Sequence, residues 1–479
     1  MKLLQRCRKR AAEDELPLRQ IFDDACRSSG DIAGHVAFAE VESSLYKRRR
    51  TAMPTLPTNA QESDAAVSGS RFAVIDQSPF YRGQVTSDDG GSALVFTTDG
   101  QLELLRSAHV IYIDATFRVV PSLYHQLFTI FVPHADYSFP VCFALMTRKT
   151  TALYDAVIRK VQELQPLFRP TQVIADFEEA PATAVRNVFG NTVVISGCWF
   201  HYAQALIKRL RKLGLTDAYR HDDETQTTFR CLLSLPLLPA GDIVPAFQEI
   251  KNLITDNSSS TAATNQLFRY VERQWLNKAS IGASRLSVRD NPSRTNNSLE
   301  SFHAALRRRI KVAHPNLFTF LGHLQRTTID SQADICRLNR GMAIRRAKKR
   351  SNIHNDSRIK TCIRRFDDNG YSRVQFLRAV SHSMGAHSSN LCETPTDSDS
   401  ETSADDADAN TNAVVATVAT PATDSNDCEV CLVAQRDPRI ALVPCGHQRF
   451  CETCANEVER QSRGCPICRT DIQMILRLF

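Results

Sequence analysis

The chain has 479 residues, of which 42% are hydrophobic and 23% are charged, and its formal net charge is +7. This length exceeds one ordinary domain, and the hydrophobic share allows a sizeable buried core. The N-terminus "MKLLQRCRKRAAEDE" lacks the apolar stretch of a secretory signal, and no apolar run approaches the ~18 residues of a membrane span. We therefore expect a soluble intracellular protein without membrane contact, in which cysteines stay reduced.

Residues 1–100 are predicted to form a helical N-terminal region that contains the basic run "YKRRR". This region shows no metal-ligand spacing, because Cys7 and Cys26 each stand alone. Further basic runs occupy residues 306–311 and 343–350. Such runs are typical of solvated surfaces, of phosphate contacts and of nuclear import. We expect DNA binding through the basic body and a nuclear or nucleocytoplasmic location.

Strand and helix patterns alternate in residues 101–330. "AHVIYIDATFRVV" indicates a strand that ends near the acid Asp114, and two more strand-like runs follow. "TTALYDAVIRKVQELQPLF" has apolar residues at helical spacing. "TQVIADFEEA" indicates a strand ending in Asp176, and "TVVISGCWFHYAQALIKRL" a strand that leads into a basic amphipathic helix. A three-strand meander followed by βαβ alternation predicts a mixed sheet flanked by helices.

Acids at the ends of neighbouring strands are one arrangement that holds divalent ions for phosphoryl transfer. We expect Asp114 and Asp176 to lie side by side on central strands. The stretch "SRTNNSLESFHAALRRRIKVAHPNLFTFLGHL" offers a third acid, Glu300, which shares a helix face with His303 and Arg307. From periodicity alone, each acid is more often a solvated strand end or a surface residue.

Four pieces of this region, "DATF", "ADFEEA", "CWFHYAQAL" and "RTNNSLESFH", resemble the catalytic domain of Mutator-like (MULE) transposases. The resemblance covers about residues 102–325. It implies a ribonuclease-H-like α/β fold with a helical insertion at about residues 202–290. It also implies an Asp-Asp-Glu site, with Mg²⁺ or Mn²⁺ as its metal, made by Asp114, Asp176 and Glu300.

Cys198 and His201 match the C-x2-H element that follows the second aspartate in this family. Two potential ligands do not complete a tetrahedral zinc site, so a packing role and a metal contact both stay open. Many family members carry a zinc-containing DNA-binding module before the catalytic domain, and residues 1–100 lack its ligand spacing. The resemblance therefore favours contact with the phosphate backbone over sequence-specific binding.

Two further segments precede the C-terminal domain. Residues 331–392 are predicted to form a basic helical extension. Residues 393–427 contain nine acidic residues and no Lys or Arg, with much Ser, Thr and Ala. This composition cannot bury enough apolar surface to offset the entropy of the chain, so it predicts a disordered acidic linker.

Residues 428–479 hold eight potential zinc ligands. Structural zinc takes four thiolate or imidazole ligands, so eight predict two closed sites. The ligands are Cys428, Cys431, Cys445, His447, Cys451, Cys454, Cys465 and Cys468. A small domain of this kind depends on its two Zn²⁺ ions for folding.

This ligand order resembles a RING finger, whereas a PHD finger has its histidine after four cysteines. The resemblance implies a cross-brace in which each zinc takes two separated ligand pairs. One zinc would be held by Cys428, Cys431, Cys451 and Cys454. The other would be held by Cys445, His447, Cys465 and Cys468.

Further residues resemble RINGs that act as ubiquitin ligases. Contacts with a ubiquitin-conjugating enzyme are implied for Val430, Pro466, Ile467 and Arg469. The tail "IQMILRLF" resembles the C-terminal strand of inhibitor-of-apoptosis and murine-double-minute RINGs, which dimerise. Phe479 matches their terminal aromatic residue. The resemblance implies a homodimer, with the conjugating enzyme and ubiquitin as partners.

We therefore predict a RING-type ubiquitin ligase with a transposase-derived body that binds nucleic acid or chromatin. One alternative is a Mutator-like DDE transposase, which cleaves and joins DNA, with an accessory RING. A second alternative is a zinc- and DNA-binding scaffold without catalysis. The retained acids favour the first alternative, while the missing DNA-recognition module and the ligase-like RING residues favour the ligase.

Overall fold

The computed structural model describes most of the chain. Outside the described residues lie 1, 15, 30–34, 118, 253–260, 290, 292–296, 311–313, 346–349, 394–427, 429–436, 438, 461–464, 466–469, 471 and 478–479. Within helices, the side chains of residues 2, 261, 297–298, 300, 350–352, 385–393, 457 and 460 are also outside the description. The predicted linker falls almost wholly in this undescribed part, apart from its first residue, Glu393, which ends a helix.

Three helices, α1 (Lys2–Glu13), α2 (Leu18–Arg27) and α3 (Phe38–Ala52), form an N-terminal unit around Cys7, Ile21, Phe22 and Leu45. Arg49 of α3 donates to the backbone carbonyls of Ala11, Asp14 and Leu16, at and just beyond the end of α1. A guanidinium suits this position because the last carbonyls of a helix have no partner within it.

Helix α4 (Ala60–Ser68) and a 3-10 turn (Arg71–Ala73) lead from this unit into strands. Short strands β1 (Val74–Ile75) and β2 (Ser78–Pro79) pair with each other, and β3 (Tyr81–Thr86) and β4 (Ser92–Phe96) join the main sheet. The expectation of a helical region to residue 100 is therefore wrong for residues 74–96, which contain four strands. Five of five residues in β4 are buried, because this strand lies inside the sheet between two others.

The main sheet has seven strands in the order β3-β4-β7-β6-β5-β8-β9. Strands β5 (Val110–Thr116), β6 (Gln126–His134) and β7 (Tyr137–Met146) form an antiparallel meander. Strands β8 (Gln172–Ala175) and β9 (Val194–Gly197) continue the sheet in parallel with β5. The predicted mixed sheet, with its meander followed by βαβ alternation, is confirmed.

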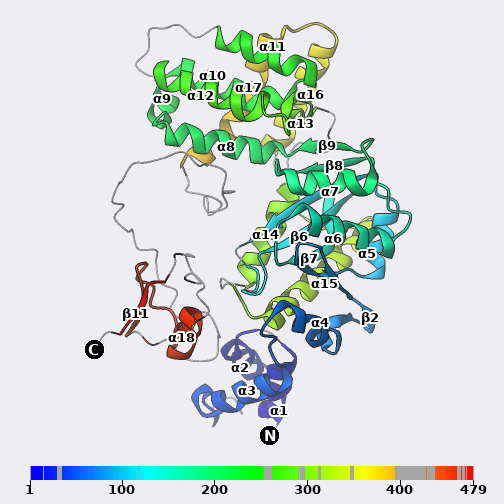
Figure 1. Cartoon of the computed structure of the whole chain (residues 1–479), viewed down its shortest axis with the longest axis vertical. Coiled ribbons are helices and arrows are strands. Elements are labelled where there is room, and N and C mark those ends of the chain that lie inside the picture. The colour runs from blue at the N-terminus through cyan, green and yellow to red at the C-terminus, as the bar shows by residue number, and fades with distance from the viewer. Residues whose placement is uncertain are drawn as a thin grey trace.

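Helices cover both faces of this sheet (Figure 1). Helices α5 (Asp99–Arg106), α6 (Thr151–Leu164) and α7 (Glu179–Phe189) pack on the face that carries Ile111 and Ile113. Helices α14 (Asn297–Ile310) and α15 (Leu317–Asn339) pack on the face that carries Tyr112. Alternate residues of a strand point to opposite faces, so β5 serves both cores. Four apolar residues of α14 that recur at helical spacing are buried there: Leu299, Phe302, Leu306 and Ile310.

The remaining helices of the body form one helical subdomain around a shared core. The chain enters it through α8 (Trp199–Lys212) and continues with α9 (Thr216–His221), α10 (Asp223–Ser234), a 3-10 turn (Leu235–Leu237), α11 (Ala240–Lys251), α12 (Thr261–Val271), a π-helical turn (Glu272–Leu276) and α13 (Gly282–Leu286).

Helices α16 (Arg350–Asp367) and α17 (Arg373–Glu393) complete this subdomain. Phe376 and Leu377 are fully buried among the insertion helices, and Arg373 donates to Asp242 and Glu249 of α11 at 2.8 and 2.9 Å. Figure 1 shows α16 and α17 among α10, α11 and α12. The predicted insertion at about residues 202–290 and the predicted extension at residues 331–392 are separate in sequence. Helices of both contribute to one core.

The C-terminal domain contains β10 (Ile440–Val443), α18 (Glu452–Arg460) and β11 (Met474–Arg477). Strand β11 pairs antiparallel with β10, with Leu442 opposite Ile475. Among the described helices of the whole chain, none combines the length and apolar character that crossing a membrane requires.

Candidate acidic site and candidate zinc centre

The sheet brings the two predicted aspartates to the same edge. Asp114 lies near the end of β5, and Asp176 directly follows the last residue of β8. These strands are parallel neighbours with Tyr112 opposite Ile174, so the same register two residues further puts Asp114 level with Asp176. Both residues are partly buried. The structure therefore provides the side-by-side position expected of them.

Helix α14 approaches this pair from the other core. The Nδ1 atom of His303 lies 3.4 Å from Oδ2 of Asp114, and each of these side chains is 11% exposed. Burial, with smaller contributions from Arg307 and His201, lowers the pKa of His303 to about 3, so a neutral imidazole faces the carboxylate at neutral pH. Glu300 lies one turn earlier on the same helix, but its side chain is outside the described residues.

A second acid lies beside Asp176. Oδ1 of Asp176 accepts a hydrogen bond of 3.1 Å from the backbone N–H of Glu178, and Nζ of Lys149 lies 3.7 Å from the Glu178 carboxylate. Burial raises the pKa of Glu178, the charge of Asp176 raises it further, and Lys149 opposes both. Glu178 is therefore a candidate site residue that the sequence analysis missed, although "ADFEEA" placed it two positions after Asp176.

The C-x2-H pair adjoins the same acids. Cys198 is the N-cap residue of α8, and His201 lies in the first turn of that helix. Burial alone would lower the pKa of His201. The neighbouring Cys198 side chain, together with Asp114 and Asp176, outweighs burial and raises that pKa well above its ordinary value. The pair thus lies beside the two aspartates, which favours a positioning role in the acidic site.

The donor set of this acidic cluster suits a hard divalent cation, because Mg²⁺ and Mn²⁺ prefer carboxylate oxygens. In the described part of the chain, groups of three or more potential ligand atoms within 4.8 Å of one another occur only in the C-terminal domain. The described acids accordingly form a looser cluster than the cysteines.

The C-terminal domain holds two compact ligand groups. Cys428, Cys451 and Cys454 form one, and Cys445, His447 and Cys465 form the other, each with ligand atoms within 4.8 Å of one another. These groups are three-member subsets of the two ligand sets that the cross-brace implies. The fourth members, Cys431 and Cys468, lie outside the described residues.

Local structure positions these ligands on short elements. Cys451 and Cys454 flank the start of α18, and His447 forms a β-bridge with Leu442. Gly446, between two ligands, has a φ of 72°, a backbone conformation that favours glycine. Clustered thiols and an imidazole fit tetrahedral zinc. The residues with predicted partner contacts lie outside the described residues: Val430, Pro466, Ile467, Arg469 and Phe479.

Two family models match the chain in these two regions. A model described as "MULE transposase domain" matches residues 110–205, and one described as "Zinc finger, C3HC4 type (RING finger)" matches residues 424–475. The first match contains the strands that carry Asp114 and Asp176. The second contains both described ligand groups. The chain therefore combines a MULE transposase domain with a C-terminal RING finger.

Particular relatives match over short stretches of the chain. The chain is 43% identical over 54 residues to "RNA-binding protein MEX3B" of Mus musculus, and 42% identical over 52 residues to "Probable E3 ubiquitin-protein ligase XBOS34" of Oryza sativa subsp. japonica. It is 36% identical over 52 residues to "Putative E3 ubiquitin-protein ligase XBAT34" of Arabidopsis thaliana. Each match covers 11% of this chain and 9%, 10% and 13% of the respective relatives.

Among solved structures, the chain is similar to the "Drosophila P element transposase strand transfer complex", at 11% identity and a TM-score of 0.28. The match covers 49% of this chain and 81% of that chain. A score this low supports no structural argument. The strand order of the sheet and the family model define the body instead.

Proposed function

We propose that this protein is a RING-type ubiquitin ligase with a transposase-derived body that binds DNA. The observation that carries the proposal is the pair of ligand groups in a RING finger whose relatives include proteins named as ubiquitin ligases. The two zincs would be held by the eight ligands of the RING pattern. Val430, Pro466, Ile467 and Arg469 would bind and orient the conjugating enzyme, from which ubiquitin passes to a lysine amine.

The direct test is autoubiquitylation by the purified full chain with a panel of conjugating enzymes. Ubiquitin conjugates that require the conjugating enzyme and disappear after zinc removal are expected. A folded, zinc-loaded chain that is inactive with every conjugating enzyme would return the RING to the class of interaction modules.

The tail strand supports the proposal of a RING homodimer. Ile475 packs into the core of the domain, whereas Met474 and Leu476, on the alternate positions of β11, are 53% and 44% exposed. Exposed apolar side chains on a strand of so small a domain are typical of an interface. A second RING is the partner we propose, with Phe479 near the ubiquitin that the partner RING holds.

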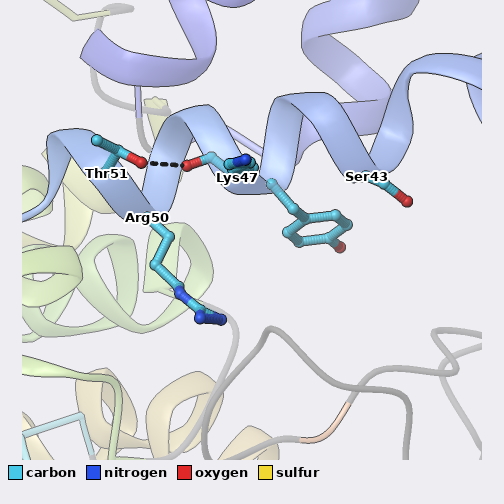
Figure 2. Close-up of a pocket in the computed structure, with 5 residues that line it drawn as sticks. Ser43, Lys47, Arg50 and Thr51 are labelled. Atoms are coloured by element: carbon cyan, nitrogen blue, oxygen red, sulfur yellow. Dashed lines mark hydrogen bonds between the residues drawn. The ribbon is translucent and has the colours of Figure 1, made fainter.

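Helix α3 supports the proposal of DNA binding. Ser43, Tyr46, Lys47, Arg50 and Thr51 line a hollow of about 540 Å³. Figure 2 shows Ser43 and Arg50 on the same side of α3, with Lys47 between them. Spacings of four and three residues place these three on one helix face. Two exposed cations and a hydroxyl on one face suit a phosphate of the nucleic acid backbone. The basic runs also lead us to propose a nuclear location.

A second candidate function is DDE-type DNA cleavage and strand transfer by a ribonuclease-H-like body. The convergence of Asp114 and Asp176 at one sheet edge favours it. Asp114, Asp176 and Glu300 would hold the divalent ions, which stabilise charge on the attacked phosphate. Glu178 and His303 would adjust the charge and orientation of these acids. Magnesium- or manganese-dependent cleavage of duplex DNA by the full chain tests this function.

A further inference from the structure

A buried arginine of the helical subdomain contacts the loop that carries Asp176. Arg285 lies on α13 and is 3% exposed. One terminal nitrogen donates to the backbone carbonyls of Asp176 and Glu178, at 2.7 and 2.8 Å, and the other donates to the carbonyl of Ser280 at 3.1 Å. A residue more than 100 positions downstream thus bridges the acid loop and its own subdomain.

The surroundings of Arg285 leave it little freedom. Its guanidinium lies over the ring of Phe177, 5.8 Å from the ring centroid, and Phe177 in turn packs edge-on against Trp275 at 4.7 Å. A Cβ on Gly197, at the end of β9, would lie 2.2 Å from the Phe177 ring and 2.9 Å from the Arg285 carbonyl. The acid loop is therefore enclosed between the sheet and the subdomain.

The three hydrogen bonds donated by Arg285 hold the turn that carries Asp176 in place. A buried guanidinium is unfavourable unless its N–H groups find acceptors. Opening the turn at residues 176–178 would remove two acceptors from Arg285, so these contacts oppose opening. Fixing the carbonyls on either side of Phe177 fixes this turn, in which Asp176 also accepts the Glu178 N–H. The direction of the Asp176 carboxylate therefore depends on Arg285.

We propose that Arg285 is a positioning residue for Asp176, through which the helical subdomain sets the divalent-cation affinity of the acidic site. This inference rests on the proposed acidic site and adds a dependence on a residue that touches no cation. Groups that orient metal ligands typically change metal affinity by about 10–100-fold when they are removed. Lys at this position keeps the charge but lacks the planar fork of two terminal nitrogens, so its ammonium cannot reproduce the geometry of these contacts.

The test uses the zinc-loaded full chain and the variants Arg285→Lys and Arg285→Gln. Arg373→Gln is the matched control, because Arg373 donates to Asp242 and Glu249 inside the same subdomain. Hydrogen exchange of residues 176–180 reports the turn without metal, and Mn²⁺ titration reports the site. We expect both Arg285 variants to exchange faster there and to bind Mn²⁺ about 10-fold more weakly. The control should lower thermal stability and leave both readouts unchanged.

The possible failures are distinguishable. A wild-type chain that binds no Mn²⁺ overturns the acidic site, and this inference with it. Arg285 variants with wild-type exchange and wild-type Mn²⁺ affinity overturn the positioning role alone. Equal losses in Arg373→Gln would also overturn it, because the effect would then be general loosening of the subdomain. Arg285→Lys, which keeps the buried charge, serves as the informative variant if Arg285→Gln does not fold.

Discussion

At the residue scale, Gly197 shows how closely the sheet and the helical subdomain approach each other. Any side chain at this position would collide with the ring of Phe177 and with the backbone carbonyl of Arg285. The guanidinium of Arg285 lies over the same ring. Glycine is needed at this position because there is no room for a Cβ. Its backbone conformation does not require glycine, because Gly197 is not among the glycines with positive φ.

The first prediction concerns this contact. Gly197→Ala should destabilise the body by about 1–3 kcal/mol, because the added methyl group displaces an aromatic ring in a packed core. Chemical denaturation followed by fluorescence measures the loss. The control Gly241→Ala lies in α11 with nothing within 4 Å of the added Cβ, and should be neutral or slightly stabilising. Equal stability of the two variants would contradict the close approach.

The second prediction separates zinc binding from ubiquitin transfer. Cys445→Ala or His447→Ala should unfold the RING and end its activity, because each removes a ligand from one group. Val430→Ala and Arg469→Ala should keep zinc content and folding, since neither is a ligand. Both should reduce transfer, Arg469→Ala through loss of a charge-assisted hydrogen bond. Zinc content and single-turnover discharge from the conjugating enzyme, measured on the same samples, check this separation.

At the scale of single elements, α3 combines two roles. Arg49 holds the end of α1 from inside the N-terminal unit, while Lys47 and Arg50 are exposed. An amphipathic helix separates such functions by face, because residues one position apart point in different directions.

The third prediction concerns that exposed face. Lys47→Ala with Arg50→Ala should weaken duplex DNA binding regardless of sequence, and should lower the slope of log affinity against log salt by about one per lost contact. Fluorescence anisotropy at several salt concentrations measures both. The control Arg159→Ala, on α6, removes a cation that already pairs with Asp155 at 2.8 Å. A control loss equal to that of the α3 variant would exclude α3 as the contact surface.

The fourth prediction concerns β11. We expect the full chain to be a dimer at micromolar concentration, and Met474→Glu with Leu476→Glu to make it monomeric with its zinc retained, because two charges replace exposed apolar contacts. Light scattering with metal analysis gives both quantities. Gln473→Glu adds a charge at a neighbouring exposed position and should leave the dimer intact. A monomeric wild-type chain would remove the dimer proposal.

At the scale of the whole molecule, the acidic site depends on two strands and on two helices that lie more than 100 positions further along the chain. Strands β5 and β8 supply the aspartates, α14 supplies His303, and α13 of the helical subdomain supplies Arg285. A cation bound here would stabilise the assembled body, because the unfolded chain does not hold these carboxylates together.

The fifth prediction follows from this linkage. Mn²⁺ at about 100 times its dissociation constant should stabilise the wild-type body by about 2.7 kcal/mol. The double variant Asp114→Asn with Asp176→Asn should lose this gain, whereas Asp330→Asn, which removes an exposed acid on α15, should keep it. Thermal unfolding with and without Mn²⁺ measures the difference. Mn²⁺ stabilisation that survives in the double variant would exclude the two aspartates as ligands.

The sequence by itself determined the features that local spacing encodes. Strand periodicity predicted β5 to β9, and helical spacing predicted α6. The positions of two acids at the ends of neighbouring strands let them be placed side by side. Cysteine and histidine spacing predicted two zinc sites, because eight ligands complete two tetrahedral ions. The resemblance to a RING finger implied which ligands share an ion, and three members of each implied set lie together in the structure.

Only the tertiary structure decided what long-range packing controls. Strands β3 and β4 joined the sheet from a region expected to be helical, and α16 and α17 completed the core of an insertion that begins at α8. Arg285 reached the Asp176 loop from a helix without any motif. Apolar periodicity tells which face of an element is buried, but not which partner covers it, because burial is non-directional and many apolar faces are equivalent partners.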